Sequence, residues 1–268
     1  MILGQETLIE KLDKFTLSDF PKTILLQGLR GSGKHLICNY ISSKFNIPLE
    51  DISKSINIDK IEEIGNRVEP YLYIIDMNIL LSKNKLDKEQ SVLLKFIEEP
   101  LANSFIIILC EAIDQVLPTI LNRCIVFNMN SYSRDILMRF TDSEDNNLIL
   151  TVAKTPGQIL EIKGEKLSDI LTFANKIIDN ILKVPYYNAL RISDKIAFDN
   201  EKDKYPLDIL LSLILHTLVE KIRVNDIDIY YIMYNYFNKL YNQIKKPYIN
   251  KKYLFENTIF SIKQRFSN

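Results

Sequence analysis

The residues with the clearest chemical potential form a glycine-rich run that ends in a lysine. The spacing G-x-x-x-x-G-K is met by Gly28-Leu29-Arg30-Gly31-Ser32-Gly33-Lys34. In such a run the glycines let backbone N–H groups curl around a polyphosphate, the lysine ammonium neutralises the outer phosphates, and the next helix adds positive potential at its N-terminus. We therefore expect a phosphate-binding loop in which Gly28, Gly31, Ser32, Gly33 and Lys34 hold the ligand.

The position after the lysine departs from the usual pattern. A serine or threonine there would place its hydroxyl on Mg²⁺, and this chain has His35. A neutral imidazole is bulkier and is a poor ligand for a hard cation that prefers oxygen. We interpret His35 as part of the loop site after its metal function has relaxed. A role as a true ligand or catalytic base is the less favoured alternative.

A carboxylate follows the second apolar run. Asp76 comes directly after residues 71–75, where a strand end would bring it near a metal ion at the phosphate loop. The next residue is Met77, whereas an ATP hydrolase of this architecture carries a glutamate there to polarise the attacking water. Loss of a general base typically lowers a rate about 10²–10⁴-fold. We expect a degenerate nucleotide site that could bind ATP weakly without hydrolysing it, and no cofactor is required.

An α/β framework must position these groups. Candidate strands lie at residues 23–27, 71–75, 105–109 and 125–127, with amphipathic helices at 32–45 and 88–99. Short apolar runs separated by helices indicate a parallel sheet covered on both faces. From about residue 131 the pattern becomes helical, and two apolar stripes mark long helices. The stripes are Leu207, Leu210, Leu211, Ile214, Leu215 and Leu218, and Tyr230, Tyr234, Phe237 and Tyr241.

The pattern predicts three domains. They are an α/β nucleotide-type domain at residues 1–130, a small helical lid at 131–166, and an all-helical domain at 167–268. The fold class is therefore α/β followed by all-α.

The composition excludes several classes of protein. The chain is 47% hydrophobic and 25% charged, with 34 Lys and Arg balancing 34 Asp and Glu, which is ordinary for a globular protein and unlike a wholesale nucleic-acid binder. No apolar run approaches the roughly 20 residues that span a bilayer, and the N-terminus shows no secretory signal. We expect a soluble cytoplasmic protein without a membrane partner.

Cysteine and histidine are too sparse for a disulfide framework or a metal centre. Cys38, Cys110 and Cys124 are scattered, and His35 and His216 are the two histidines. No zinc set can be assembled at the usual spacing, so we expect no metal site. The cysteines are interpreted as small side chains of the core.

The C-terminal segment is basic and aromatic. Residues 239–268 carry one acid, Glu256, and seven basic residues, which are Lys239, Lys245, Lys246, Lys251, Lys252, Lys263 and Arg265. Interleaved aromatic residues would suit a nucleic-acid surface. The helical spacing favours packing faces from which lysine stems extend to water.

Several segments together resemble the AAA+ clamp-loader subunits of bacterial DNA polymerase III. The resemblance covers residues 1–165 and is carried by Ile2-Leu3-Gly4-Gln5, by residues 58–64, by Leu93-Leu94-Lys95-Phe96-Ile97-Glu98-Glu99-Pro100, by Cys110 at the sensor 1 strand, and by Leu117-Pro118-Thr119-Ile120-Leu121-Asn122-Arg123-Cys124. It implies an AAA+ sheet domain, a lid and a helical collar domain.

The departures from the family pattern point to one kind of subunit. In this family the arginine of the last motif is a finger that reaches the ATP of a neighbouring subunit, and Arg123 is retained although Asn122 replaces serine. Gln158 stands where a motor subunit has its sensor 2 arginine. A lone arginine would more often form a surface ion pair, but within this motif we favour the finger. Glu98 and Glu99 are either a solvated helix end or an intersubunit contact.

The resemblance therefore implies a delta-prime-like, non-hydrolysing subunit. Its implied partners are gamma or tau and delta subunits in a heteropentamer, the sliding clamp, and primed DNA indirectly. The alternative is an ATP-hydrolysing motor subunit, gamma- or tau-like, in which His35 and an unidentified acid replace the missing groups. A small-molecule kinase is disfavoured because no arginine-rich lid follows the core.

Overall fold

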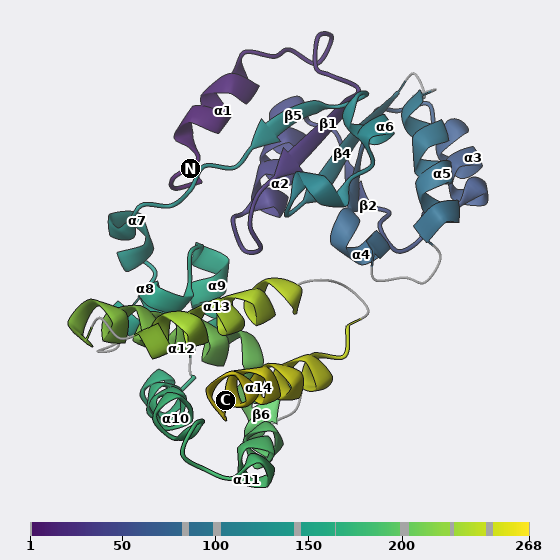
Figure 1. The fold of residues 1–268 in the computed structure, drawn as a ribbon. Helices are drawn as coiled ribbons and strands as arrows, with labels where there is room; N and C mark the ends of the chain where they lie inside the picture. Colours follow the sequence, from purple (N-terminus) through teal and green to yellow (C-terminus); the bar gives the residue numbers. More distant parts are fainter. Residues whose placement is uncertain are drawn as a thin grey trace. The chain divides into compact units, whose positions relative to one another are not determined.

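The computed structural model describes residues 2–81, 86–98, 103–141, 146–163, 165–198, 204–225, 228–244 and 249–267. The chain forms two compact units, one of residues 1–140 with 154–161 and the other of residues 141–153 with 162–268 (Figure 1). The predicted lid segment, residues 131–166, is shared between these units, and the three-domain division stays a prediction. Glu99, Pro100, Lys245 and Lys246 lie outside the described residues.

A five-stranded parallel sheet forms the centre of the first unit. The strands are β1 (Thr23–Gln27), β2 (Leu49–Asp51), β3 (Tyr71–Asp76), β4 (Ser104–Cys110) and β5 (Ile125–Asn128). They are arranged in the order β2-β3-β4-β1-β5. Because all are parallel, their carboxyl ends meet at one edge of the sheet. The predicted parallel sheet is thus confirmed, and β2 is an addition that three residues with a single apolar member could not signal.

Helices cover both faces of this sheet, as expected for buried parallel strands. Alternate strand residues point to opposite faces, so Leu26 packs with the helices α1 (Glu6–Asp13) and α2 (Lys34–Phe45). Leu25 packs on the opposite face, where α3 and α5 lie side by side in Figure 1. The helices on that face are α3 (Ile58–Gly65), α4 (Met77–Leu81), α5 (Leu86–Glu98) and α6 (Pro118–Leu121).

Three short helices complete the bounds in this part of the chain. They are the 3-10 helix η1 (Ile113–Gln115), α7 (Arg134–Met138) and α9 (Pro156–Ile162).

The sheet was expected to be covered on both faces, and this is wrong at β5. Ile125 is 49% exposed and Val126 is 37% exposed, because β5 is an edge strand with no neighbour beyond it.

The second unit is mainly helical, as predicted. It contains α8 (Asn146–Val152), α10 (Leu167–Asn180), α11 (Tyr186–Leu190), η2 (Arg191–Lys195), α12 (Leu207–Asn225), α13 (Asp228–Gln243) and α14 (Lys251–Ser267). It also holds two paired two-residue strands, β6 (Ile196–Ala197) and β7 (Tyr205–Pro206). The expectation of no strands here is wrong, because two residues are too few to show alternation.

The core of this unit contains one of the two predicted stripes as expected. Five of the six α12 residues of that stripe are buried, and Leu215 is partly buried. On α13 the buried residues are Met233, Phe237 and Leu240. The predicted stripe is therefore wrong for its three tyrosines, because Tyr230, Tyr234 and Tyr241 are only partly buried.

The basic C-terminal segment contributes to packing through Lys263. Its Nζ donates to the carbonyl oxygens of Ile181 and Val184 at 2.8 and 2.6 Å, so its stem lies over the helical core. Cys38 and Cys110 are buried and Cys124 is partly buried, as expected. None of the helices in the described ranges has the length and apolarity that a membrane span requires.

Candidate functional site

The glycine-rich loop connects the carboxyl end of β1 to the first turn of α2. Gly31 and Gly33 have φ angles of 74° and 89°, in the left-handed region that glycine adopts without strain. Alternation of right- and left-handed residues turns successive N–H groups to one side and forms a concave anion site. The predicted loop is therefore present at the predicted edge of the sheet.

Lys34 reaches across this loop. Its side chain is 7% exposed, and its Nζ donates to the carbonyl oxygens of Gly28 and Leu29 at 2.5 and 3.1 Å. Burial lowers the pKa of Lys34, and the negative charges of Glu111 and Asp76 oppose that shift. An ammonium held in this way still has a third proton that could face a bound phosphate.

The outer side of the loop is held by three donors from distant parts of the chain. The Thr155 hydroxyl donates to the Arg30 carbonyl at 2.8 Å, and the Tyr132 hydroxyl donates to the Ser32 carbonyl at 2.8 Å. The Gly157 N–H donates to the Gly31 carbonyl at 3.0 Å. With Lys34 engaging Gly28 and Leu29, every carbonyl from residue 28 to residue 32 accepts a hydrogen bond. Of the loop's own N–H groups, that of Gly28 donates to the Cys110 carbonyl at 3.0 Å and that of Ser32 donates to the Leu29 carbonyl at 3.1 Å. The N–H groups of Gly31, Gly33 and Lys34 have no such acceptor among the described residues and can face a ligand.

The loop and the start of α9 are in backbone contact. A Cβ built on Gly157 would lie 2.4 Å from the Cα of Gly31, and one built on Gly31 would lie 2.8 Å from the Gly157 Cα. No side chain fits at either position. The absence of side chains at both glycines lets α9 close against the loop.

The residues present fit a phosphate group. The Ser32 hydroxyl is buried and has no hydrogen-bond partner among the described residues, which is the condition of a polar group awaiting a ligand. Lys34 and the backbone N–H groups of Gly31, Gly33 and Lys34 would hold the phosphates, and the Ser32 hydroxyl could add a hydrogen bond. A nucleotide would supply the phosphoanhydride there, and this chain would bind and orient it.

Two positions that a hydrolysing site would use depart from the usual pattern. His35 is exposed on α2, and buried Met77 follows Asp76. The Asp76 carboxylate accepts from the backbone N–H of Asn78 at 2.9 Å, and its own N–H donates to the Ser53 hydroxyl at 2.8 Å. Across the described ranges, no three His, Cys, Asp or Glu side chains converge as a metal site would require.

Gln158 is turned toward its own helix end. Its side-chain oxygen accepts from the Lys154 N–H at 2.8 Å, while the Gln158 N–H donates to the Thr155 hydroxyl at 3.3 Å. Thr155 therefore caps α9, with Pro156 as the first helical residue. In this arrangement Gln158 stabilises the helix that closes on the loop.

Glu111 is a site residue that the sequence reasoning missed. It follows β4 directly, as Asp76 ends the neighbouring β3, so both carboxylates reach the carboxyl edge of the sheet. The Asn78 side-chain nitrogen donates to Glu111 at 3.4 Å. The sequence did contain a signal, because an acid directly after a buried apolar run falls at the strand edge.

The N-terminal segment and Tyr132 also border the site. The Gln5 side chain is fully buried and exchanges two hydrogen bonds with the backbone of Asn130, at 3.0 and 2.8 Å. A Cβ on Gly4 would lie 2.9 Å from the Tyr132 ring, and burial raises the pKa of Tyr132. The segment thus fixes the tyrosine that holds the loop.

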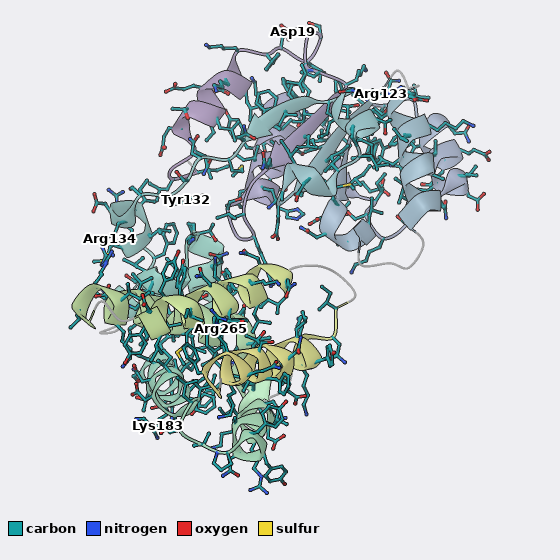
Figure 2. The ribbon with its side chains drawn as sticks, viewed as in Figure 1. Asp19, Arg123, Tyr132, Arg134, Lys183 and Arg265 are labelled. Atoms are coloured by element: carbon teal, nitrogen blue, oxygen red, sulfur yellow. The ribbon has the colours of Figure 1, made fainter. Side chains whose placement is uncertain are left out.

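Arg123 lies at the opposite edge of the sheet. The register pairs Ile24 with Ile125 and Gln27 with Asn128, so Arg123 precedes β5 at the amino edge while the loop follows β1 at the carboxyl edge. Figure 2 shows Asp19 and Arg123 along one side of the first unit and Tyr132 toward the other. The strand length alone separates the two sites by about 10 Å.

The Arg123 side chain is 39% exposed and has two contacts with other residues that the structure describes. One terminal nitrogen donates to the Thr119 carbonyl at 2.7 Å, and the other lies 2.7 Å from a carboxylate oxygen of Glu98. Arg123 thus forms a surface ion pair, as one of its two sequence interpretations expected, and the finger stays a prediction. The Glu98 side chain, at the end of α5, is solvated as one of its two interpretations expected.

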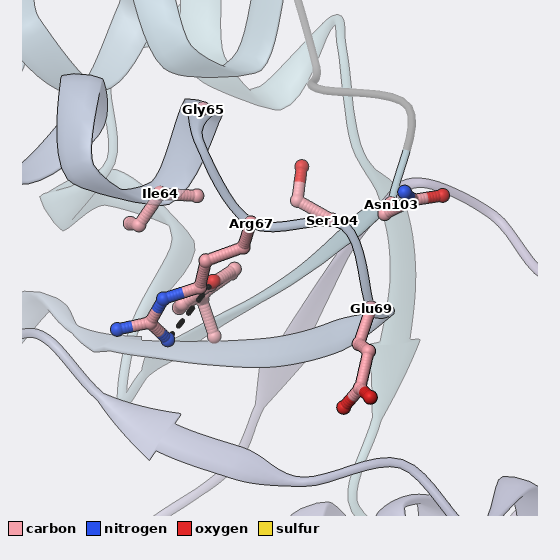
Figure 3. A pocket seen from close by; sticks show the side chains of 7 residues that line it. Ile64, Gly65, Arg67, Glu69, Asn103 and Ser104 are labelled. Atoms are coloured by element: carbon pink, nitrogen blue, oxygen red, sulfur yellow. Dashed lines mark hydrogen bonds between the residues drawn. The ribbon is translucent and has the colours of Figure 1, made fainter.

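A separate cavity of about 170 Å³ opens near Tyr73 and Ser104 (Figure 3). None of the predicted site residues lines it. Its one cation, Arg67, donates to Tyr73 at 3.3 Å and forms ion pairs with Glu50 and Glu63 at 2.5 and 2.7 Å. Two carboxylates already balance this charge, so the cavity offers no anion site.

A family model and a curated protein each match part of this chain. A family model described as DNA polymerase III, delta subunit, matches residues 44–133. The DNA polymerase III subunit gamma of Buchnera aphidicola subsp. Schizaphis graminum is 25% identical over 173 residues, which are 52% of this chain and 47% of that protein. The aligned region thus spans about half the length of this curated relative.

Solved structures resemble the chain at low sequence identity. A DNA polymerase III gamma subunit-related protein of Thermotoga maritima is 14% identical, with a TM-score of 0.49 over 98% of this chain and 99% of that one. A RuvB variant of the same organism is 15% identical, with a TM-score of 0.47 over 82% of this chain and 76% of that one. The DNA clamp loader delta protein of Bacillus subtilis is 13% identical, with a TM-score of 0.36 over 97% of this chain and 99% of that one.

Proposed function

We propose that this chain, which is similar to clamp-loader subunits of DNA polymerase III, is a delta-prime-like subunit of that AAA+ family and does not hydrolyse ATP itself. In this function Arg123 acts as a finger in trans on ATP held by a neighbouring ATPase subunit. The complex would be a heteropentamer with gamma- or tau-like and delta-like subunits in the cytoplasm. It would load the sliding clamp onto primed DNA during replication.

The position of Arg123 is the observation that carries this proposal. It is exposed at the amino edge of the sheet, whereas the chain's own phosphate loop lies at the carboxyl edge. A guanidinium there is poorly placed to reach a nucleotide on its own subunit, and a nucleotide on a docked neighbour is the alternative target. An arginine finger supplied in trans is worth about 10³–10⁵ in rate in other phosphoryl-transfer systems.

The chain's own loop supports the second half of the proposal. Met77 replaces a water-polarising acid, His35 is exposed at the metal position, and Gln158 caps its own helix. Three functions of a hydrolysing site are therefore absent from the groups around Lys34. Phosphate binding depends on none of them, so weak ATP binding without turnover is compatible with this site.

The second candidate is a motor subunit with an atypical site, and Glu111 favours it. This carboxylate lies at the strand edge near Lys34 and contacts Asn78. It is the acid that the alternative requires, since a general base must stand beside the bound phosphates. Under that alternative the chain alone would hydrolyse ATP.

The test of the proposed function is Arg123→Ala in a reconstituted clamp loader. We expect ATP turnover at the neighbouring site, stimulated by DNA and clamp, to fall about 10-fold or more while the subunits still assemble. A matched control is Arg223→Ala, because Arg223 is an exposed arginine paired with Glu220 at 2.9 Å. Turnover equal to that of the unmodified complex would exclude the finger.

A further inference from the structure

The acidic end of α5 contacts the cation that the proposed function uses. We propose that Glu98 is a positioning residue for Arg123, fixing the guanidinium in the orientation that a neighbouring nucleotide requires. This inference rests on the proposed finger function and deepens it. Its basis is the 2.7 Å contact between a Glu98 oxygen and one Arg123 terminal nitrogen.

Two contacts determine the plane of the guanidinium. Glu98 holds one terminal nitrogen and the Thr119 carbonyl holds the other, each at 2.7 Å. A planar group fixed at two separate nitrogens cannot rotate freely about its last bond. Arginine has five N–H donors, so three remain beyond these two contacts. Those donors are available to an anionic group that approaches the edge.

The two anchors come from elements that the sheet brings together. α5 returns to the amino edge of the sheet and its described part ends at Glu98, and α6 places Thr119 one turn before Arg123. A carboxylate in the last turn of a helix opposes the helix dipole, which is unfavourable. Pairing with Arg123 offsets that unfavourable placement.

The ion pair between Glu98 and Arg123 contributes little to folding stability. The two side chains are 39% and 47% exposed, and ion pairs of this exposure contribute little to stability because water screens them. Orientation is where such a contact has a large effect, because a catalytic group misplaced by about 1 Å can lower a rate about 100-fold. An arginine that is ordered before docking also loses less side-chain entropy when the neighbour arrives.

The test compares Glu98 variants in the reconstituted clamp loader with primed DNA and clamp. The variants are Glu98→Gln, Glu98→Ala, Arg123→Ala and the double variant Glu98→Ala with Arg123→Ala. We expect both Glu98 variants to lower the kcat for ATP about 3- to 10-fold, less than Arg123→Ala, with the KM for ATP little changed. Glu98→Ala should add nothing when Arg123 is already removed, since both changes act through one group.

Two further measurements separate a positioning role from a structural one. Assembly and the urea midpoint of each variant should match the unmodified protein, and Glu220→Gln, which removes the partner of Arg223, should leave kcat unchanged. If Arg123→Ala lowers turnover while the Glu98 variants do not, or raise it, the positioning role is wrong and the finger stands. If the Glu98 and Arg123 effects multiply, Glu98 acts elsewhere and the inference also fails. If Arg123→Ala has no effect, the proposed function itself is rejected.

Discussion

Lys34 and Arg123 carry the same charge in contrasting environments. Lys34 is buried, donates to loop carbonyls, and has its pKa lowered by that burial. Arg123 is exposed, with spare donors at the opposite edge of the sheet. A buried ammonium serves a ligand inside its own subunit, whereas an exposed and anchored guanidinium suits a group on another surface. Under the proposed function, Lys34 would bind a nucleotide within its own subunit and Arg123 would assist a nucleotide on a neighbouring one.

Cys38, on α2 just after the phosphate loop, allows a prediction about pH. Burial raises the pKa of its thiol from an ordinary value of 9.0 to about 12. The folded state thus holds this proton more tightly than the unfolded chain does. The stabilisation that this thiol gives the folded state is complete below the pKa of the unfolded state. As the pH rises from there toward the pKa of the folded state, the free energy of unfolding falls by about 1.4 kcal/mol per pH unit. Urea unfolding should show the free energy of unfolding falling above about pH 9.

The control for this pH dependence is Cys38→Ala. Its free energy of unfolding should fall less steeply over the same alkaline range, although Cys110 and Cys124, whose pKa values are raised to about 11 by burial, still contribute. An identical slope in both proteins would contradict the assignment to Cys38. The same thiol should resist alkylation at about pH 8 until the protein unfolds, because the thiolate is the reactive form.

At the scale of elements, the phosphate loop depends on segments distant in the sequence. The Tyr132 and Thr155 hydroxyls reach it across 100 and 125 residues. The motif predicted the loop because glycine spacing and a lysine are local properties. The outer contacts could not be predicted, since they depend on where the β5–α7 connection and α9 fold back. Short β2 was missed for a related reason, because this edge strand lacks the run of buried residues that identifies a strand.

The backbone contact between the loop and α9 can be tested by Gly157→Ala. The added Cβ would lie 2.4 Å from the Gly31 Cα and 2.9 Å from its carbonyl oxygen. Backbone cannot move aside as a side-chain end can, so α9 must shift and its bond to the loop weakens. We expect the free energy of unfolding to fall by about 1–3 kcal/mol in a urea titration.

The matched control is Gly65→Ala at the end of α3. Gly65 does not have a positive φ, and alanine in a helix is favoured over glycine by up to about 1 kcal/mol. This variant should be as stable as the unmodified protein or slightly more stable. Equal stability of Gly157→Ala and Gly65→Ala would mean that α9 does not close on the loop as described.

At the scale of the whole molecule, the two halves of the chain differ in how much of their structure the sequence predicts. The α/β half contains specific motifs and buried strands, so its sheet and its phosphate loop could be predicted. The helical half contains only periodicity, which predicted the stripe on α12 but centred the α13 stripe on tyrosines instead of Met233 and Leu240. Amphipathic tyrosines resemble core residues in a pattern, yet their hydroxyls favour the margin of a core.

The whole chain, purified alone, decides between the two candidate functions. With Mg²⁺ and ATP we expect turnover no higher than that of Lys34→Ala, because Met77 supplies no base and His35 is exposed. Binding of a fluorescent ATP analogue should be lost in Lys34→Ala and kept in Glu111→Gln, since the Lys34 ammonium would neutralise the phosphates. Robust turnover abolished by both Lys34→Ala and Glu111→Gln would instead identify a motor subunit in which Glu111 is the general base. Glu161→Gln serves as the control, because its pair with Arg30 at 3.1 Å lies on the outer side of the loop and should not affect turnover.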